Sequence, residues 1–205
     1  MEYRIHQKTG DKISIIGLGT GPVFDMQERE AVRTLSYAFE NGINYIDFAT
    51  AGAETFRYAG EAFASVRKEL LYQIHFGANY ETGEYGWTTD LETVRRQIDW
   101  QLKELKTDYI DYGFIHCLDA KSDWKDYQEN GILEYLQEMK AAGVVKTYRS
   151  VFSYACACQA GFGYRNCGSA DVFDQSCLRL PAWGLCERQC QRADGAFIAA
   201  VRQKE

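Results

Sequence analysis

The chain has 205 residues, of which 46% are hydrophobic and 14% aromatic, enough apolar side chain to build the core of one globular domain. Its formal net charge is -6, so nucleic acid and anionic membrane surfaces are disfavoured as its main partners. No apolar run approaches the ~20 residues of a membrane span. The first twelve residues lack the apolar core of a signal peptide, and we therefore expect a cytoplasmic protein.

The first 146 residues alternate between short β-branched or aromatic runs and amphipathic stretches. They open with a predicted hairpin, in which Tyr3–Ile5 and Ile13–Ile16 flank a turn at Thr9-Gly10-Asp11. Beyond the hairpin, strands are expected at residues 14–21, 45–49, 70–77 and 108–117, and helices at residues 26–41, 58–67, 89–105 and 127–142.

Residues at the predicted helix ends support these boundaries. Gly42 and Gly143 stand where a left-handed C-terminal cap is expected. Thr89 and Glu92 have the spacing of a capping box, which predicts a helix start.

This alternation predicts an α/β fold with right-handed crossovers and a parallel sheet. Four to five strand-helix units make about half of a (β/α)₈ TIM-type barrel, which typically needs ~250 residues. Periodicity alone equally allows an open doubly wound sheet. Val144 and Val145 are expected to begin a fifth strand, with an irregular tail after it.

Two predicted strands end in polar side chains that suit chemistry. Asp47 follows the apolar run of N-Y-I-D-F-A-T, and His116 closes D-Y-I-D-Y-G-F-I-H. In parallel α/β sheets the ligand lies beyond the carboxyl ends of the strands. Asp47 and His116 are therefore candidates for one shared site, although a carboxylate that merely caps a turn would also explain Asp47.

Four segments carry a resemblance to a known family. T-G-D-K-I-S-I-I-G-L-G-T-G, N-G-I-N-Y-I-D-F-A, D-Y-I-D-Y-G-F-I-H and M-K-A-A-G-V-V-K occur in the order and spacing of the aldo-keto reductases. The resemblance covers residues 1–146 and implies the N-terminal half of a barrel. It further implies an oxidoreductase that reduces a small-molecule carbonyl with NADPH or NADH.

The family uses an aspartate, a tyrosine, a lysine and a histidine, and the resemblance carries over only in part. Asp47 matches the aspartate and His116 the histidine, while His75 stands at the lysine position. Gly60 fixes the register, which puts Gly52 where the tyrosine belongs.

These replacements predict weak or absent activity, because glycine cannot donate a proton to the carbonyl oxygen. Tyr58 or Tyr80 could stand in for the acid, although neither fits the family pattern. A core histidine whose hydrogen bonds are satisfied would explain His75 as well as a catalytic one. The resemblance also places Gly19 and Thr20 in the loop near the nicotinamide.

Residues 147–205 differ in composition, since six of the seven cysteines follow residue 146. A metal site is not expected, because Cys156 and Cys158, and Cys186 and Cys190, lack C-x-x-C spacing and no histidine accompanies them. Disulfides are not expected in a reducing compartment either.

The genetic code offers another explanation for this segment. If each true codon takes the last two bases of one residue and the first base of the next, Thr147 onward admits H-I-G-L-S-S-H-T-P-A-L. Residues 161–180 likewise admit V-L-D-T-G-I-V-D-L-L-M-F-S-I-N-P-A-Y-D-Y. Both resemble the family sequence that follows G-V-V-K. We therefore interpret residues 147–205 as a frameshifted tail and not as a true domain.

Three functions of different classes remain open at this point. The chain is an aldo-keto reductase of reduced activity, a non-catalytic half-barrel, or a cysteine-rich metal or redox module attached to a half-barrel. The family holds the far end of the cofactor mainly through loops after its last two strands, which residues 1–146 do not include. A truncated cofactor site is therefore expected.

Overall fold

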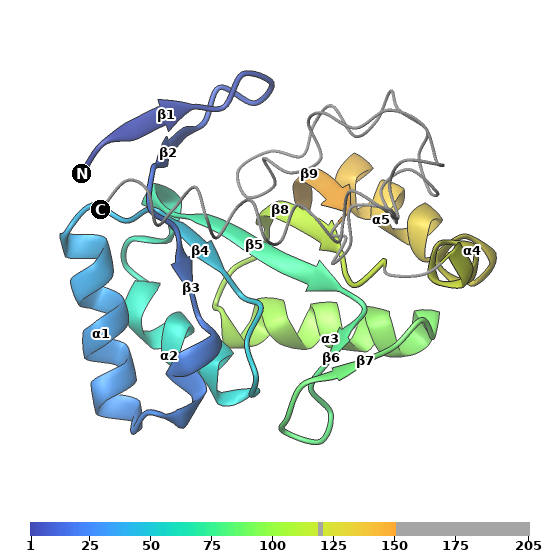
Figure 1. Ribbon diagram of the computed structural model, residues 1–205, viewed down its shortest axis with the longest axis horizontal. Coiled ribbons are helices and arrows are strands. Elements are labelled where there is room, and N and C mark those ends of the chain that lie inside the picture. The colour runs from blue at the N-terminus through green and yellow to red at the C-terminus, as the bar shows by residue number, and fades with distance from the viewer. Residues whose placement is uncertain (119–120, 151–205) are drawn as a thin grey trace, which may run out of the picture. The chain divides into compact units, whose positions relative to one another are not determined.

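The computed structural model describes residues 1–118 and 121–150, and a parallel sheet of five strands forms the centre of this part (Figure 1). The strand order is β3-β4-β5-β8-β9, and every neighbouring pair is parallel. The parallel α/β architecture predicted from the sequence is confirmed. The strands are β3 (Leu18–Gly19), β4 (Tyr45–Asp47), β5 (Leu71–Phe76), β8 (Ile110–Ile115) and β9 (Val145–Ser150).

The register of the sheet brings the carboxyl ends of neighbouring strands to one edge. Gly19 pairs with Asp47, and Asp47 in turn pairs with Gln73. On the other side of β5, His75 pairs with Phe114 of β8. Polar residues that follow β4, β5 and β8 are therefore neighbours in space.

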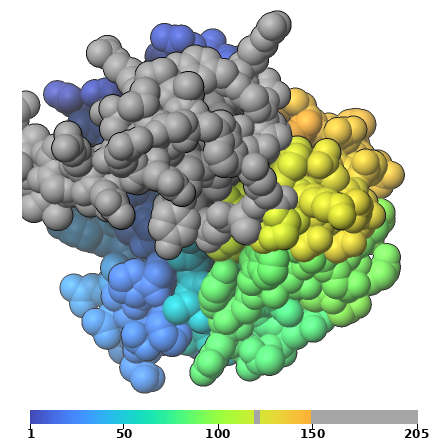
Figure 2. All heavy atoms as spheres, turned by 45° about the vertical axis from the view of Figure 1, so that its right-hand side comes forward, coloured from blue at the N-terminus to red at the C-terminus, as the bar shows by residue number. Residues whose placement is uncertain are grey.

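Helices α1, α2 and α3 lie on the same side of the sheet (Figure 1). Each buries an apolar stripe, represented by Leu35, Phe56 and Ile98, whose exposed fractions are 0%, 0% and 1%. Helix α1 (blue) and the segment from β6 to α3 (green) both reach the surface (Figure 2). The helices are α1 (Glu28–Glu40), α2 (Glu54–Phe63), α3 (Leu91–Glu104), α4 (Lys121–Glu129) and α5 (Ile132–Ala141), with short 3-10 turns η1 (Gly21–Asp25) and η2 (Arg67–Glu69). None of the helices in this part of the chain is long and apolar enough to cross a bilayer.

Two antiparallel hairpins accompany the sheet. The first pairs β1 (Tyr3–Ile5) with β2 (Lys12–Ser14) and confirms the predicted N-terminal hairpin. The second pairs β6 (Ala78–Asn79) with β7 (Gly86–Trp87) directly after β5, and the sequence analysis did not predict it.

The strand predicted over residues 14–21 is wrong in length. Only β3 (Leu18–Gly19) joins the sheet, while Ile15 and Ile16 are 48% and 55% exposed. Ser14 ends β2, and its hydroxyl donates to the Ile16 carbonyl at 2.7 Å, so the chain turns where the apolar run suggested a continuous strand. Strand β9 begins at Val145, as expected, and continues to Ser150.

Helix boundaries also differ from the prediction, at α2 and in the last predicted helix. Helix α2 begins at Glu54 and not at Tyr58. The helix expected over residues 127–142 is divided into α4 and α5, because Gly131 adopts a φ of 77° between them. Gly42 and Gly143, with φ of 89° and 76°, confirm the predicted C-terminal caps.

The N-terminal cap of α3 is Asp90, so the predicted capping box at Thr89 is wrong. The Asp90 carboxylate accepts from the Thr93 backbone N–H at 2.8 Å and from the Thr93 hydroxyl at 2.7 Å. A carboxylate at this position also interacts favourably with the helix dipole, which a threonine does not.

The buried carboxylate of Asp111 ties three strands together at the amino-terminal end of the sheet. Its Oδ2 accepts from Arg67 Nη2 and from the Tyr72 backbone N–H, both at 2.9 Å. Its Oδ1 accepts from Lys146 Nζ at 2.7 Å. The Arg67 guanidinium also lies over the rings of Tyr72 and Tyr109, at 3.8 and 4.0 Å. These contacts join η2, β5, β8 and β9 through one charged group.

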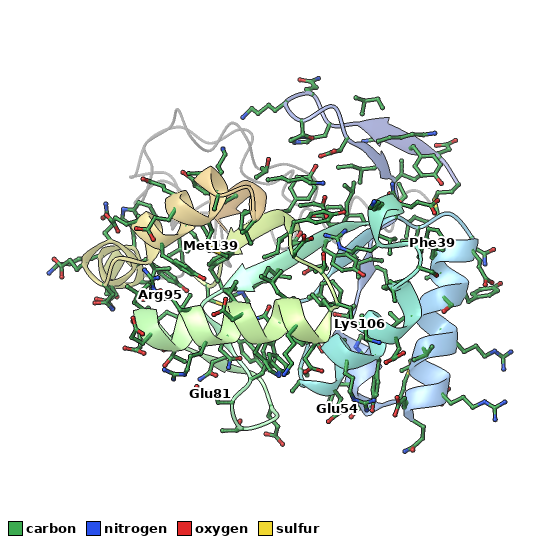
Figure 3. The ribbon with its side chains drawn as sticks, turned by 180° about the vertical axis from the view of Figure 1, so that it is seen from behind. Phe39, Glu54, Glu81, Arg95, Lys106 and Met139 are labelled. Carbon is green, nitrogen blue, oxygen red and sulfur yellow. The ribbon has the colours of Figure 1, made fainter. Side chains whose placement is uncertain are left out.

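Helices α2 and α3 approach closely at Gly60. A Cβ at this position would lie 2.0 Å from the Glu104 carbonyl oxygen, so only glycine allows the observed packing. Lys106, which follows α3 and is labelled in Figure 3, donates to Glu61 Oε1 of α2 at 2.6 Å.

We predict that Arg67→Met destabilises the fold by about 3–5 kcal/mol, because it leaves the Asp111 carboxylate buried without its guanidinium partner. Arg57→Met is the matched control, since Arg57 forms exposed ion pairs with Glu28 and Glu54 and its loss should cost at most about 1 kcal/mol. Urea unfolding of both variants measures the difference. Equal losses would show that the buried network does not hold the sheet.

Gly60→Ala should destabilise by about 1–3 kcal/mol, although alanine favours helix by up to about 1 kcal/mol at an unhindered site. The loss is expected because the Glu104 carbonyl belongs to a helix backbone and cannot move aside like a flexible side chain. Ala59→Gly, one residue earlier in the same helix, separates the propensity effect from the clash. A Gly60→Ala chain as stable as wild type would contradict this account of the packing.

Candidate active site

Three residues predicted for the site lie at the carboxyl ends of the sheet strands. Asp47 is the last residue of β4, His75 is the fifth residue of β5, and His116 follows β8 directly. His75 is 4% exposed, whereas the Asp47 side chain is 24% exposed. The structure thus brings together residues that are 28 and 41 positions apart in the sequence.

The three side chains form one hydrogen-bonded row. His75 Nε2 lies 2.8 Å from Asp47 Oδ1, and His75 Nδ1 lies 2.9 Å from His116 Nδ1. The Ala49 backbone N–H donates to the same Asp47 oxygen at 3.0 Å. His75 occupies the centre of the row. The sequence alone explained this residue equally well as a core histidine or as a catalytic one.

The chemistry of the groups sets the direction of the hydrogen bonds. The Asp47 carboxylate only accepts, so His75 Nε2 must carry the proton. With both imidazoles neutral, His75 Nδ1 accepts from the N–H at His116 Nδ1, which leaves His116 Nε2 as an acceptor. A proton gained at His116 Nε2 would therefore be stabilised by the carboxylate at the other end of the row.

A fourth group, Tyr85, completes the row and was missed by the sequence analysis. Its hydroxyl lies 2.8 Å from His116 Nε2, and the two rings meet edge to face with centroids 5.5 Å apart. Tyr85 immediately precedes β7, in the hairpin that had not been predicted. The turn signal in E-T-G-E-Y-G, with Gly83 at a φ of 89°, is the feature that could have revealed it.

The loop that carries Tyr85 is fixed to the loop after β4. The Tyr85 N–H donates to the Ala51 carbonyl and the Ala53 N–H donates to the Gly83 carbonyl, both at 2.8 Å. Gly52 forms an antiparallel bridge with Glu84 between these bonds. The backbone of Tyr85 is therefore held next to position 52.

A side chain at position 52 would require Phe24 to move. A Cβ on Gly52 would lie 2.9 Å from Cδ2 and 3.1 Å from Cβ of Phe24, which belongs to η1. The Phe24 ring thus covers the place from which a side chain at position 52 would extend. The glycine is part of a local packing arrangement and not an isolated change.

The two tyrosines considered earlier as substitutes are engaged elsewhere. The Tyr80 hydroxyl donates to the Thr50 carbonyl at 3.1 Å, and burial raises the pKa of this phenol well above its ordinary value. Tyr58 is 8% exposed on α2, with the Arg57 guanidinium 4.8 Å from its ring centroid. Both arrangements favour structural roles.

Gln73 and Tyr45 lie on the core side of His75. Gln73 Nε2 lies 3.1 Å from His75 Nε2. Because both nitrogens carry protons, this is a packing contact and not a hydrogen bond. The Tyr45 hydroxyl donates to Gln73 Oε1. Burial and the nearby Asp47 charge raise the pKa of Tyr45, so it remains a neutral donor. The orientation of the imidazole is therefore set by its hydrogen bonds to Asp47 and His116, with Gln73 and Tyr45 packed on its core side.

The two residues expected near a nicotinamide differ in their surroundings. Thr20 is fully buried, and both its hydroxyl and its N–H donate to the Asp47 carbonyl, at 2.8 and 3.1 Å. Gly19 ends β3, and a Cβ there would meet no atom within 4 Å. A Cβ at Gly19 would thus be unhindered by the described residues, whereas Thr20 positions the strand that carries Asp47.

Comparison with known proteins identifies the class. The model of the aldo/keto reductase family matches residues 15–150, so the chain belongs to this family. L-galactose dehydrogenase of Arabidopsis thaliana is 28% identical over 152 residues, which are 70% of this chain and 46% of that protein. The uncharacterized oxidoreductase YqkF of Bacillus subtilis is 27% identical over 140 residues, 66% of this chain and 44% of that protein.

Solved structures support the same fold. An aldo-keto reductase from Bacillus halodurans, in its holo form, matches with a TM-score of 0.62 and 23% identity over 76% of this chain and 51% of that chain. The sheet is therefore the barrel type and not the doubly wound alternative. The chain spans about half the length of the curated relatives it matches.

Restoring a tyrosine at position 52 should fail. We predict that Gly52→Tyr destabilises the fold by about 1–3 kcal/mol, because its Cβ would overlap the Phe24 ring. The double variant Phe24→Ala with Gly52→Tyr should be more stable than the sum of the two single changes predicts, a difference that a double-mutant cycle of urea unfolding measures. Strict additivity would show that Phe24 does not exclude a side chain at this position.

Proposed function

We propose that this chain carries the carbonyl-binding end of an NAD(P)H-dependent reductase of small-molecule aldehydes or ketones. The observation that carries the proposal is the hydrogen-bonded row from Asp47 through His75 to His116 at the carboxyl edge of a barrel sheet. A carbonyl oxygen that becomes an alkoxide needs a hydrogen-bond donor and then a proton. The protonated form of His116, linked through His75 to the partly buried Asp47 carboxylate, suits both needs.

The cofactor would supply the hydride, and the residues of this chain would place it. Gly19 leaves space for a flat ring at the end of β3, beside the strand that ends in Asp47. Thr20 contributes by fixing the Asp47 backbone, through its buried hydroxyl. His116 would then orient the carbonyl oxygen, with Asp47 and His75 acting as positioning residues behind it.

We further propose that residues 147–205 are read out of frame, as the decoding of that segment into family-like sequence supports. These residues lie almost wholly outside the described part of the chain, as do the six cysteines. A cofactor bound mainly through the first half of the barrel would be held weakly. The proposed function is therefore a carbonyl reductase whose turnover is limited by cofactor binding.

A non-catalytic half-barrel is the second candidate. The observations that favour it are the absent side chain at Gly52 and the span of about half of the relatives' length. The non-catalytic half-barrel predicts that nicotinamide cofactors do not change the unfolding temperature. The reductase proposal predicts a rise in the unfolding temperature with NADPH concentration, because a ligand that binds only the folded state stabilises it.

The purified chain should oxidise NADPH slowly with a simple aldehyde such as 4-nitrobenzaldehyde, with kcat/KM well below 10⁴ M⁻¹s⁻¹, roughly the low end for enzymes. His116→Ala should remove this activity, and His6→Ala, in the N-terminal hairpin, is the matched control. The measurement is the loss of absorbance at the nicotinamide wavelength under cofactor excess. Equal rates in wild type and His116→Ala would contradict the proposed function, and a bound metal in the purified chain would instead favour the cysteine-rich module.

A further inference from the structure

We propose that Tyr85 is the proton donor of this site and that His116, His75 and Asp47 form a relay behind it. The proposal rests on the carbonyl reduction proposed above and names the residue that protonates the product. The resemblance places the family's tyrosine at position 52, which is glycine here, so it does not assign this role to Tyr85. The assignment comes from the contacts of Tyr85 in this structure.

The position of the Tyr85 hydroxyl is the first argument. It lies 2.8 Å from His116 Nε2, the ring nitrogen that faces away from His75. The Tyr85 side chain is 43% exposed, so a small carbonyl compound can reach it. A substrate oxygen that accepts from the Tyr85 hydroxyl would thus lie beside the His116 ring.

The second argument is that the tyrosine is held in place. Its backbone donates to Ala51, and the neighbouring Glu84 bridges Gly52. The phenol therefore enters the site from the loop directly opposite the missing side chain. Phe24 fills the space at position 52 itself. The hydroxyl beside His116 therefore comes from Tyr85 of the hairpin and not from a side chain at position 52.

The proton balance of the step is complete. Before reaction, His116 is an imidazolium that donates from Nε2 to the Tyr85 oxygen and from Nδ1 to His75. As the hydride of NAD(P)H forms the new C–H bond, the Tyr85 O–H proton passes to the carbonyl oxygen, and the His116 Nε2 proton passes to the phenolate oxygen. The products are the alcohol, NAD(P)⁺, a neutral tyrosine and a neutral His116, which regains its proton from water.

The charged and titratable groups around the row favour this assignment. Asp47 supplies the negative charge that stabilises the imidazolium, through His75. Tyr45 and Tyr80, the phenols that sense the Asp47 charge, are hydrogen-bonded to Gln73 and to the Thr50 carbonyl and have raised pKa values. Among the described phenols, Tyr85 is hydrogen-bonded to the His116 ring, whereas the Tyr127 hydroxyl donates to the His116 backbone carbonyl at 2.7 Å.

The test compares Tyr85→Phe with Tyr37→Phe in the full chain. Tyr37 is 65% exposed on α1 and serves as the matched control. With 4-nitrobenzaldehyde and saturating NADPH, Tyr85→Phe should lower kcat by about 10²-fold or more, the range that general acid catalysis contributes. The KM for NADPH should stay unchanged, and so should the unfolding midpoint in urea. Tyr37→Phe should match wild type in all three.

A second readout follows the relay without turnover. In an NMR titration, His116 should lose its proton at a lower pH in Asp47→Asn than in wild type, because the carboxylate that favours the imidazolium is lost. An unchanged His116 titration would overturn the relay, and Tyr85→Phe with wild-type kcat would overturn Tyr85 as the donor. A wild-type chain that oxidises no NADPH would instead overturn the proposed function, and with it any acid role.

Discussion

The Asp111 carboxylate is 2% exposed, and the arrangement of the sheet depends on how its charge is balanced. Removing a carboxylate from water costs several kcal/mol unless cations and hydrogen-bond donors surround it. Arg67 and Lys146 supply the cations, and the Tyr72 N–H supplies a backbone donor from β5. Because these groups come from separate elements, they are satisfied together only in one register of β5, β8 and β9. A shift of one residue would also turn buried side chains to the other face.

That register brings polar residues from distant parts of the sequence to the same edge of the sheet. Asp47 pairs with Gln73, and His75 pairs with Phe114, so Asp47, His75 and His116 reach the same edge from three strands. The end of the sheet with Asp111 is stabilising, and the opposite end carries the residues of the proposed site. This division is typical of barrels of parallel strands. The polar residues of the proposed site thus lie on a sheet whose register is set at its opposite end, around Asp111.

Much of this scaffold was predictable, because strands such as Ile110–Ile115 are apolar runs and helices such as α3 have a clear stripe. Asp47 and His116 were predictable as strand-end polar residues, and His75 from the family resemblance. Tyr85 was not, since its role depends on a hairpin whose strands have two residues each, too short for periodicity. The helix break at Gly131 and the exposed Ile15 and Ile16 were missed for a related reason: local hydrogen bonds and backbone φ overrode the apolar pattern.

The central claim is that Asp47, His75, His116 and Tyr85 form one row with a defined direction of donation. Nitrogen-15 NMR of histidine-labelled chain tests it most directly, because it reports which ring nitrogen of each imidazole carries the proton. At a pH where both rings are neutral, the account predicts a proton on His75 Nε2 and on His116 Nδ1, with bare nitrogens at His75 Nδ1 and His116 Nε2. A proton on His116 Nε2 in the neutral ring, or an even mixture of tautomers at His75, would contradict the row.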